Sequence, residues 1–334
     1  MKTSALWFWL MWAGFAGLAA GWVMYWHVLA GEAQTRLESW VAEQNAQGAQ
    51  ASIVRVTRRG FPVLLRLELQ DFAYEPARGG WRVNTERVDL HVQMLNPAQV
   101  KFEAKAPIAF TRADGAVTSL SASALIASWR TARGALAVAG IEADNLALDD
   151  PGREGIMRAR KLVLNLRPDP RAAGEYQLAF DAEALTLPRP VRSFEAFGLE
   201  VTNVRAAIVV EHGADLLDSS PQDPLGPWRD AGGRLRFEAL SLHWGPLEAT
   251  GSGQGGLDEE RRPQGALELP IDRPGPVFGA LANGPGVEES ARRALGLLAA
   301  GYTLSGDDIK LDVDAHSGVL RLEGLPVRQL PPVY

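Results

Sequence analysis

The sequence predicts a mainly β fold with few helices, in which an N-terminal transmembrane helix precedes an elongated, curved antiparallel β-sheet or meander. Three observations predict this fold class. An uninterrupted apolar run, Ala5–Trp26, comes before the first acidic residue, Glu32. Most later segments alternate apolar and polar residues with a period of two, which is typical of strands with one buried and one solvated face. Only one long later stretch, residues 287–300, has helical periodicity.

The apolar run is long enough to cross a membrane. At about 1.5 Å per helical residue, it spans a hydrocarbon core of about 30 Å. No water is available inside a bilayer for backbone polar groups, so a spanning segment must be helical. We therefore expect a cytoplasmic tip at residues 1–4 and a transmembrane helix at residues 5–28. Lys2 precedes the run, and this positive charge favours an N-terminus in the cytoplasm with the bulk of the chain outside it.

Aromatic residues lie toward both ends of this segment. Trp7 is near the first end, and Trp22, Tyr25 and Trp26 are near the second. Amphipathic rings prefer the depth of the lipid headgroups. We therefore expect these four residues to lie at the membrane interface, where the N-terminal helix binds the lipid bilayer.

A cleaved signal peptide is the alternative for this segment. Lys2, the apolar core and the small residues Ala19-Ala20-Gly21 fit such a peptide. Signal cores usually contain about 7–15 apolar residues, whereas this run continues past Gly21 to Trp26. The longer run favours a retained anchor.

A second helical segment is predicted directly after the membrane exit, at residues 29–48. Leu37, Trp40 and Val41 fall on one face at helical spacing, and Gly48 ends the segment. This pattern predicts a juxtamembrane amphipathic helix that packs on the rest of the chain. Residues 49–334 then form a β-rich domain.

Six segments of that domain alternate well enough to be predicted as strands. They are residues 63–69, 88–94, 162–166, 235–239, 309–314 and 319–323. Turn residues such as Arg78-Gly79-Gly80 and Asp149-Asp150-Pro151-Gly152 separate the alternating segments. A loose recurrence of strand, turn and returning strand, at residues 136–164 and 237–251, predicts hairpins whose consecutive strands pair.

Three stretches depart from the strand pattern. Residues 287–300 place apolar side chains on one helical face, begin after Pro285 and end at Gly301, so a helix is predicted. Residues 219–233 are rich in Pro, Asp and Gly, which predicts a surface loop and a subdomain boundary. Residues 330–334 contain adjacent prolines that lack backbone donors, so a regular strand interior is excluded there.

Composition excludes several classes of protein. The chain has no cysteine, which excludes disulfides, thiolate metal sites and cysteine nucleophiles. Its formal net charge of −6 gives no support for binding to nucleic acid, which requires a clustered basic face. Its hydrophobic content of 46%, with 22% charged residues, is that of a folded protein.

No catalytic, cofactor-binding or metal-ligating residues are predicted. Residues 251–256 match G-x-G-x-x-G, but the polar and then extended sequence after them does not predict the helix that a dinucleotide site requires. The five histidines are isolated, without a carboxylate at ligand spacing. Asp312 and Asp314 lie on the outer face of a predicted strand and lack the pattern of a calcium loop.

Short motifs give the chain a family resemblance. Gly60-Phe61-Pro62 is followed by Leu67-x-Leu69-x-Asp71, behind an apolar anchor, and the chain closes with Gly318-Val319-Leu320-Arg321-Leu322-Glu323-Gly324-Leu325-Pro326. With these motifs the chain resembles the DUF2125 family of bacterial, membrane-anchored proteins and, more distantly, AsmA-like and YdgA-like envelope proteins. The resemblance implies a β-rich body in the periplasm of a Gram-negative cell, anchored in the inner membrane. It implies no catalytic residues.

The leading functional hypothesis is a non-enzymatic envelope protein that handles lipid. A sheet with one apolar face must fold over it, cover it with a helix, or accept an apolar ligand. The resemblance to AsmA-like proteins implies a groove for lipid acyl chains. In this chain the groove would be lined by the apolar faces of the strands near Leu67, Leu90, Leu164 and Phe237. A fully packed β scaffold that binds other envelope proteins is the main alternative, and a periplasmic hydrolase or glycan enzyme is a third.

Overall fold

The computed structural model describes residues 3–77, 79–132, 135–150, 156–190, 195–218, 223, 225–284 and 287–333, without the side chains of residues 3–8, 217 and 218. The mainly β prediction is confirmed, with 51% strand and 25% helix. The chain forms two compact units. Unit 1 comprises Met1–Val117 and Ile126–Gly134, and unit 2 comprises Thr118–Leu125 and Ala135–Tyr334. The predicted boundary at residues 219–233 therefore lies inside unit 2.

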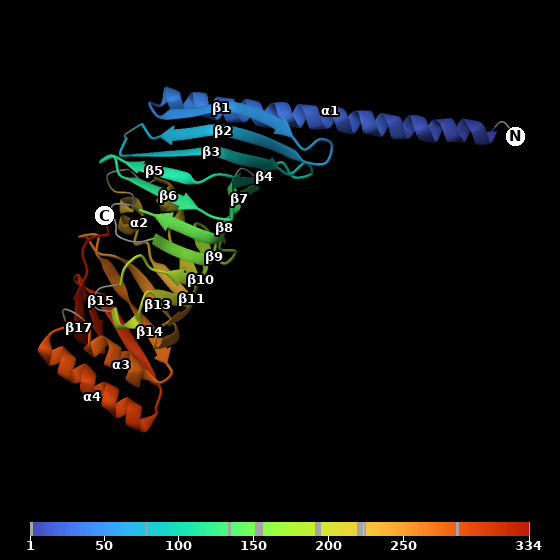
Figure 1. Cartoon of the computed structure of the whole chain (residues 1–334). Helices are drawn as coiled ribbons and strands as arrows, with labels where there is room; N and C mark the ends of the chain where they lie inside the picture. The colour runs from blue at the N-terminus through green and yellow to red at the C-terminus, as the bar shows by residue number, and fades with distance from the viewer. Residues whose placement is uncertain are drawn as a thin grey trace. The chain divides into compact units, whose positions relative to one another are not determined.

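Unit 1 consists of a long helix and a small antiparallel sheet (Figure 1). Strand β3 pairs with β2, β4 and β5, while β1 pairs with β2 and β4 pairs with β7. Residues 126–132 of β7 belong to this unit. The elements are α1 Thr3–Ala46, β1 Gln50–Arg59, β2 Leu65–Glu75, β3 Trp81–Val92, β4 Gln99–Ala104, β5 Ile108–Arg112 and β7 Ala124–Ala132.

The two predicted N-terminal helices form one uninterrupted helix, α1. Gly31 does not break it, because a glycine inside a helix costs only about 1 kcal/mol relative to alanine. The helix ends at Ala46, and Gly48 has a φ of +90°, as expected for a glycine after a helix end. The Asn45 side chain then accepts a hydrogen bond from Ala51 N at 2.7 Å and donates one to Ala51 O at 3.0 Å.

The core of unit 1 lies between α1 and the sheet. Strand β2 points alternate leucines at the helix, and Leu65 and Leu67 are at most 1% exposed. They pack with Trp26 and Leu29 of α1 and with Leu90 of β3. The part of α1 that begins at Trp26 thus covers this apolar sheet face. Of the residues on the predicted amphipathic face, Leu37 packs against this core, whereas Trp40 is 38% exposed.

The first half of α1 has no such cover. Every residue from Trp9 to Tyr25 is exposed, and Figure 1 shows this part of α1 extending beyond β1 and β2. Among the described residues, α1 is the one helix long and apolar enough to cross a membrane. An apolar helix exposed on all sides is typical of a segment surrounded by lipid rather than water.

Asp71 explains one of the motifs singled out in the sequence. Its φ of +52° places it in the left-handed region inside β2. The neighbouring pairs Gln70–Arg87 and Phe72–Thr85 show that the register of β2 and β3 is the same on either side of it. Aspartate tolerates this backbone conformation better than most residues, which accounts for an aspartate at the end of Leu67-x-Leu69-x-Asp71.

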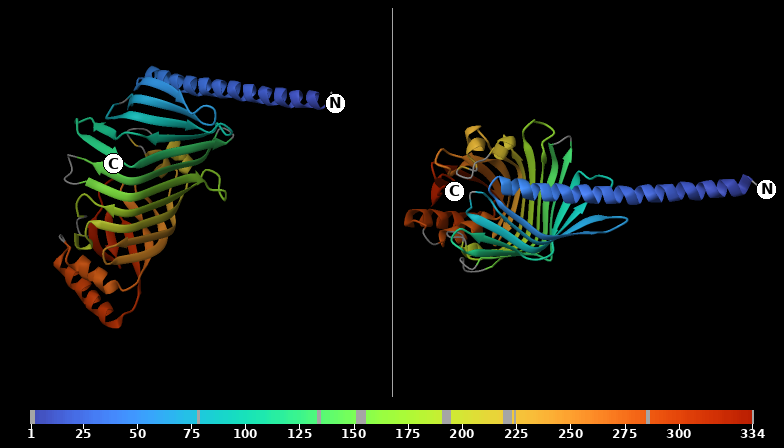
Figure 2. Two further views of the ribbon diagram at one scale, coloured as in Figure 1. Left: turned by 45° about the vertical axis from the view of Figure 1, so that its right-hand side comes forward. Right: turned by 90° about the horizontal axis from the view of Figure 1, so that it is seen from above.

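Unit 2 is a long antiparallel meander. Consecutive strands pair from β8 to β17, and β6 pairs with β8. Each of the six predicted strands overlaps an observed one, so the predicted meander of hairpins is confirmed. The strands are β6 Val117–Ser121, β8 Ala135–Asp149, β9 Ile156–Pro168, β10 Tyr176–Thr186, β11 Glu200–Val210, β12 Leu235–Trp244, β13 Leu247–Leu257, β14 Pro263–Ile271, β15 Ile309–His316, β16 Val319–Leu322 and β17 Leu325–Gln329. Figure 2 shows that the sheet of this unit curves continuously from β8 to β15.

Helices cover one part of the unit 2 sheet. Helix α3 (Pro274–Ala282) and helix α4 (Glu289–Ser305) pack together, and Phe278, Leu281 and Leu295 fill the core beneath them. The predicted helix at residues 287–300 is confirmed as α4, but it continues through Gly301 to Ser305 and is followed by Gly306, whose φ is +70°. Short helical turns complete the unit: η1 Glu195–Phe197, η2 Gly213–Asp218 and α2 Gly226–Asp230.

The prediction of a surface loop at residues 219–233 is wrong for the part that is described. Residues 219–222 and 224 lie outside the described residues. Helix α2 occupies Gly226–Asp230, and Trp228 is 4% exposed. Its indole nitrogen donates to Glu211 O at 2.7 Å. The composition of this segment predicts a loop, but the buried side chain of Trp228 holds a short helical turn in place.

Candidate functional site

Unit 2 has one apolar sheet face, built by the register of its strands. Leu164 of β9 lies opposite Phe180 of β10, and through Ala206 of β11 this row reaches Leu240 of β12. A second row runs beside it from β9 to β14, and its large side chains are Leu166, Leu178, Ile208, Phe237 and Leu267. We define the apolar face as Leu164, Leu166, Leu178, Phe180, Ile208, Phe237, Leu240 and Leu267.

A β-bulge keeps this face apolar. In β12, Phe237 and Leu240 pair with Gly253 and Gly251, so two residues lie between positions that share a face. Those two residues, Glu238 and Ala239, are exposed. Without the extra residue, strict alternation would place one of the two large apolar side chains on the opposite, polar face.

The apolar face is only half-buried. Each of its eight side chains is intermediate in exposure, and none of them is a buried member of a core cluster. Full burial on the same side of the sheet occurs where α3 and α4 cover Ala249, Ile271 and Leu311, and in a small cluster around Ala143 and Ala159. The strands between these two clusters therefore present a hydrocarbon surface that the described residues do not seal.

The glycine-rich motif belongs to this sheet. Residues 251–256 lie inside β13, with no helix after them, so the geometry of a dinucleotide site is missing. A Cβ on Gly251 would lie 2.2 Å from Glu268 O, and one on Gly253 would lie 2.2 Å from Ala266 O. These glycines allow the backbone of β14 to approach β13 closely.

The structure separates the four predicted groove residues into two pairs. Leu164 and Phe237 lie on the apolar face of unit 2. Leu67 and Leu90 do not line an open groove, because α1 covers them, and they are 0% and 6% exposed. The sequence showed that each strand had an apolar face, but not which face a helix would cover. The other members of the apolar face became visible only from the register of the strands.

The predicted membrane-interface aromatics mark where α1 meets the sheet of unit 1. Trp22 and Trp26 donate indole hydrogen bonds to Pro62 O and Leu64 O, both at 2.7 Å. Trp22 is 37% exposed, while Trp26 is only 4% exposed. The ring of Trp26 is thus covered by protein, whereas the ring of Trp22 is open to its surroundings.

Tyr25 and Trp7 complete the set of predicted interface residues. The hydroxyl of Tyr25 donates to Met94 O at 2.6 Å, and the residue is 40% exposed. The side chain of Trp7 lies outside the described residues. Trp22 and Tyr25 are therefore the two predicted residues that have both a protein partner and an exposed ring.

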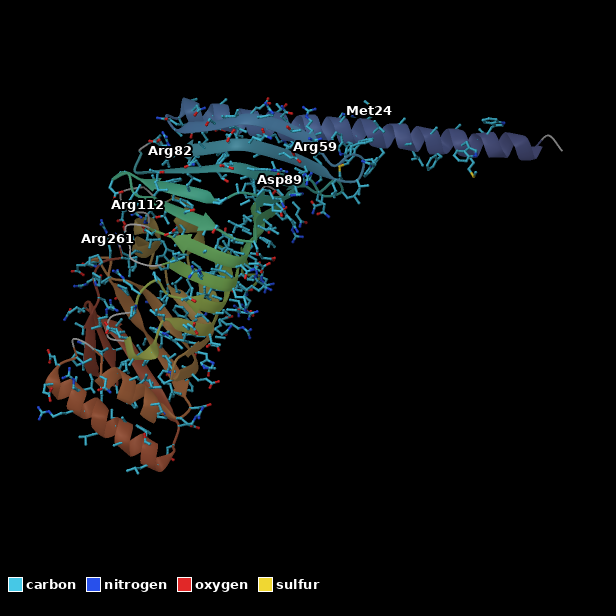
Figure 3. All side chains as sticks on the ribbon, viewed as in Figure 1. Met24, Arg59, Arg82, Asp89, Arg112 and Arg261 are labelled. Atoms are coloured by element: carbon cyan, nitrogen blue, oxygen red, sulfur yellow. The ribbon has the colours of Figure 1, made fainter. Side chains whose placement is uncertain are left out.

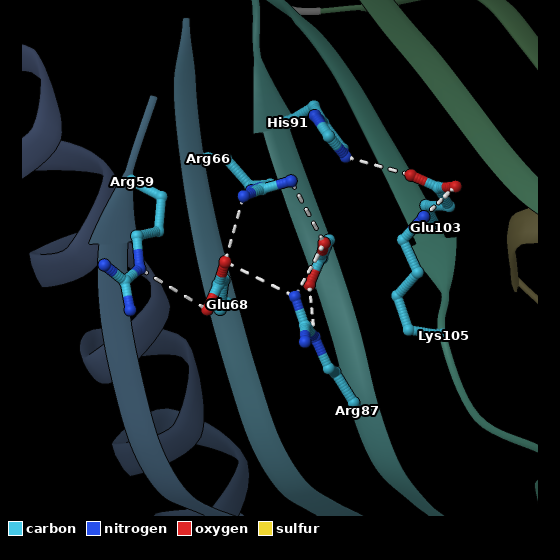
Figure 4. A network of polar contacts seen from close by, with 8 residues as sticks. Arg59, Arg66, Glu68, Arg87, His91, Glu103 and Lys105 are labelled. Carbon is cyan, nitrogen blue, oxygen red and sulfur yellow. Dashed lines mark hydrogen bonds and ion pairs between the residues drawn. The ribbon is translucent and has the colours of Figure 1, made fainter. Parts of the chain in front are cut away.

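The opposite face of the unit 1 sheet carries a polar network (Figure 4). Asp89 of β3 is 0% exposed, and its carboxylate accepts a hydrogen bond from Arg87 Nε at 3.0 Å. Arg66 approaches Asp89 at 3.7 Å and Glu68 at 3.0 Å. The hydrogen bond that Arg87 donates to Asp89 raises the pKa of Arg87 above its ordinary value.

Three residues of this network could in principle ligate a metal ion. Ligand atoms of Asp89, His91 and Glu103 lie within 4.8 Å of one another. However, Arg66 and Arg87 already neutralise Asp89, and a hydrogen bond from Lys105 lowers the pKa of Glu103. Three fixed cations would repel a further one, so the residues fit an ion-pair network and not a resident metal.

His91 corrects the prediction that the histidines are isolated. Its Nε2 lies 3.2 Å from Glu103 Oε2, because Glu103 is opposite Asp89 across β3 and β4. The two residues are twelve positions apart, with a turn between them. Only the pairing register of the hairpin brings them together.

Loss of the Asp89 charge should destabilise unit 1. The substitution Asp89→Asn leaves Arg66 and Arg87 with Glu68 as their remaining acidic partner, and we expect the free energy of unfolding to fall by about 2 kcal/mol. The expected loss is below the range for fully buried pairs because both arginines are partly exposed. Urea denaturation, with the transition of unit 1 followed by hydrogen exchange in β2 and β3, measures it.

Glu289→Gln is the matched control for that acid-to-amide change. Glu289 pairs with Arg292 at 3.3 Å, and its side chain is 68% exposed. An exposed pair of this kind contributes less than about 1 kcal/mol. Equal losses for the two variants would show that burial of Asp89 adds nothing to the stability of the network.

Unit 1 also has an open hollow of about 570 Å³. Arg82 of β3 and Arg112 of β5 contribute to its lining and lie at the same end of these strands (Figure 3). Arg82 is bound to Glu75 at 2.7 Å. The hollow is open, and Arg112 also has an acidic partner, Asp114, at 3.7 Å. It is therefore a weaker candidate site than the apolar face of unit 2.

Fold and site together define a mainly β protein with an exposed apolar N-terminal helix and a half-buried apolar sheet face. The chain belongs to the DUF2125 family, described as uncharacterized protein conserved in bacteria, whose profile matches residues 26–331. The resemblance inferred from the short motifs is thereby confirmed, while the more distant likeness to AsmA-like proteins stays a prediction. No curated protein and no solved structure matches the chain.

Proposed function

We propose that this chain is a single-pass protein, anchored by α1 in the inner membrane with its bulk in the periplasm, and that unit 2 holds lipid acyl chains. The observation that carries the proposal is the apolar face of unit 2. Eight hydrocarbon side chains, from strands β9 to β12 and β14, lie on one face and remain only half-buried. A soluble monomer rarely leaves so continuous an apolar surface without a use.

The anchor part of the proposal rests on the first half of α1. Residues 9–25 are apolar and exposed on every side. In water each large side chain would forgo about 1.5–3 kcal/mol of burial free energy, whereas a bilayer supplies that burial. The positive charge of Lys2 ahead of the helix supports an N-terminus in the cytoplasm.

The chemistry of the apolar face favours an acyl chain as the ligand. Its members are leucine, isoleucine and phenylalanine, which offer no hydrogen-bond partner to a polar ligand. Sites for small apolar molecules are lined mainly by such residues. These side chains can neither transfer a proton nor act as a nucleophile, so the proposed role is to hold lipid and not to transform it.

A photoreactive phospholipid incorporated into cell membranes tests the proposal with the full-length chain. After illumination, we expect lipid-modified peptides from β9, β10 and β12 in addition to peptides from α1. Phe180→Asp places a charge on the apolar face and should reduce crosslinking to these strands at least about tenfold, since a charged side chain strongly disfavours a hydrocarbon neighbour. Crosslinks to α1 should persist and serve as the internal standard.

Ala179→Asp is the matched control, because Ala179 is exposed on the opposite face of the same strand. This variant should keep the crosslinks of the natural chain. Crosslinks confined to α1 in all three proteins would contradict lipid binding by unit 2. Protection of the apolar face by a co-purifying protein would then favour the alternative of an interaction scaffold.

A further inference from the structure

We propose that two loops of unit 1 insert into the membrane surface beside α1, so that the protein is held by three neighbouring segments and not by the helix alone. The first loop, Gly60–Leu64, joins β1 to β2. The second, Gln93–Ala98, joins β3 to β4. We call these two segments the tip loops. The proposal rests on the membrane anchoring of α1.

The tip loops are bound to the part of α1 that we assign to the membrane interface. Trp22 and Trp26 donate to carbonyls of the first loop, and Tyr25 donates to Met94 O of the second. Phe61 packs edge-on against Trp26, with ring centroids 5.4 Å apart. Trp22 lies one helical turn closer to the N-terminus than Trp26, so the first loop reaches the level of the exposed apolar run.

Most exposed side chains of both tip loops are apolar, and Gln93 is the exposed polar one. Phe61, Val63 and Leu64 are 50%, 71% and 60% exposed, and Leu95 of the second loop is 84% exposed. Loop tips on a water-exposed surface usually carry small or polar residues. Exposed hydrocarbon on two loops that contact the same helix indicates one shared apolar environment.

The backbone of the tip loops suits a place with little water. Leu64 N and Val63 N donate to Gly60 O at 2.8 and 3.1 Å, and Asn96 N donates to Gln93 O at 3.0 Å. Pro62 has no backbone donor to satisfy. The aromatic residues of α1 satisfy the carbonyls of Pro62, Leu64 and Met94. Polar backbone groups are costly at the membrane unless they are paired in this way.

Basic side chains flank the first tip loop. Arg58 and Arg59 precede it, and Arg66 follows it. The side chain of Arg59 is 60% exposed and lies 3.7 Å from Glu68. Arg66 is 36% exposed and also pairs with Glu68, at 3.0 Å. Arginines placed just above an inserted apolar loop complement the phosphates of lipid headgroups. The expected occupant is therefore the headgroup and upper acyl layer of a phospholipid bilayer that contains anionic lipid.

The absence of cysteine from the chain allows a direct test. Val63→Cys and Leu95→Cys are labelled with an environment-sensitive fluorophore in the full-length chain, which is reconstituted into vesicles of phosphatidylethanolamine and phosphatidylglycerol. Val54→Cys is the control, because Val54 is 74% exposed in β1 but lies away from the tip loops. Lipids brominated on the acyl chain are then used to quench the fluorophore.

We expect a blue-shifted emission and at least about twofold quenching at positions 63 and 95, with neither effect at position 54. Water-like emission without quenching at all three positions, in protein that floats with the vesicles, overturns the insertion of the tip loops and leaves the anchor standing. Protein that does not float with the vesicles overturns the anchor and the inserted loops together.

Discussion

Replacement of Phe278 by alanine is expected to lower the free energy of unfolding of unit 2 by about 4 kcal/mol. Phe278 lies on α3 and is 1% exposed. Its ring stacks on Tyr302 of α4 at a centroid distance of 5.7 Å. Truncation removes the burial of the ring and leaves a cavity, because the helix pair and the sheet can only partly collapse around it. Urea denaturation with hydrogen exchange in β13–β15 measures the loss in this unit.

Leu297→Ala provides the control for that measurement. Leu297 lies on α4, which packs with α3, but it is 76% exposed. Substitutions at such positions change stability by less than about 0.5 kcal/mol. If Phe278→Ala were as stable as this control, the packing of α3 and α4 over the sheet would not be a core of unit 2.

Replacement of Leu67 by alanine should have the next largest effect, a loss of about 3 kcal/mol in unit 1. Leu67 is 0% exposed and lies opposite Leu90 on the sheet face beneath α1. The substitution removes a contact that joins α1 to the sheet. We therefore expect faster hydrogen exchange in β2 and β3 and also in the second half of α1.

Val54→Ala is the matched control, because Val54 is 74% exposed on β1. It should leave exchange in α1 unchanged. An equal effect of the two substitutions would mean that α1 is not held by the leucines of β2. In that case, the cover that distinguishes the sheet face of unit 1 from the apolar face of unit 2 would have to be assigned to other residues.

Much of the fold was predictable because its signals are local. The alternation in residues 162–166 and 309–314 reports one buried face per strand, and β9 and β15 contain these segments. Gly48 follows the end of α1 with a positive φ, as its position after a helical pattern predicts. The motif around Gly60 and Asp71 was specific enough to indicate the family that the profile then matched.

Local signals failed where packing overrides propensity. Helix α3 was not predicted, because Pro274–Ala282 is short, contains two prolines and is apolar on most sides, so its periodicity is weak. Gly301 does not end α4, since contacts along the helix pair extend it to Ser305. Residues 226–230 form a turn of helix because Trp228 is buried, although their composition predicts a loop.

The sequence by itself determined that the chain has an apolar N-terminal helix, two-faced antiparallel strands, no thiol chemistry and membership of the family. These properties depend on residue type and on spacing along the chain. Only the tertiary structure decided that α1 covers Leu67 and Leu90, that Leu164 and Phe237 share an uncovered face, and that His91 meets Glu103. Such contacts depend on which strands pair, in which register and under which helix, and these are free-energy differences among distant segments that no local pattern records.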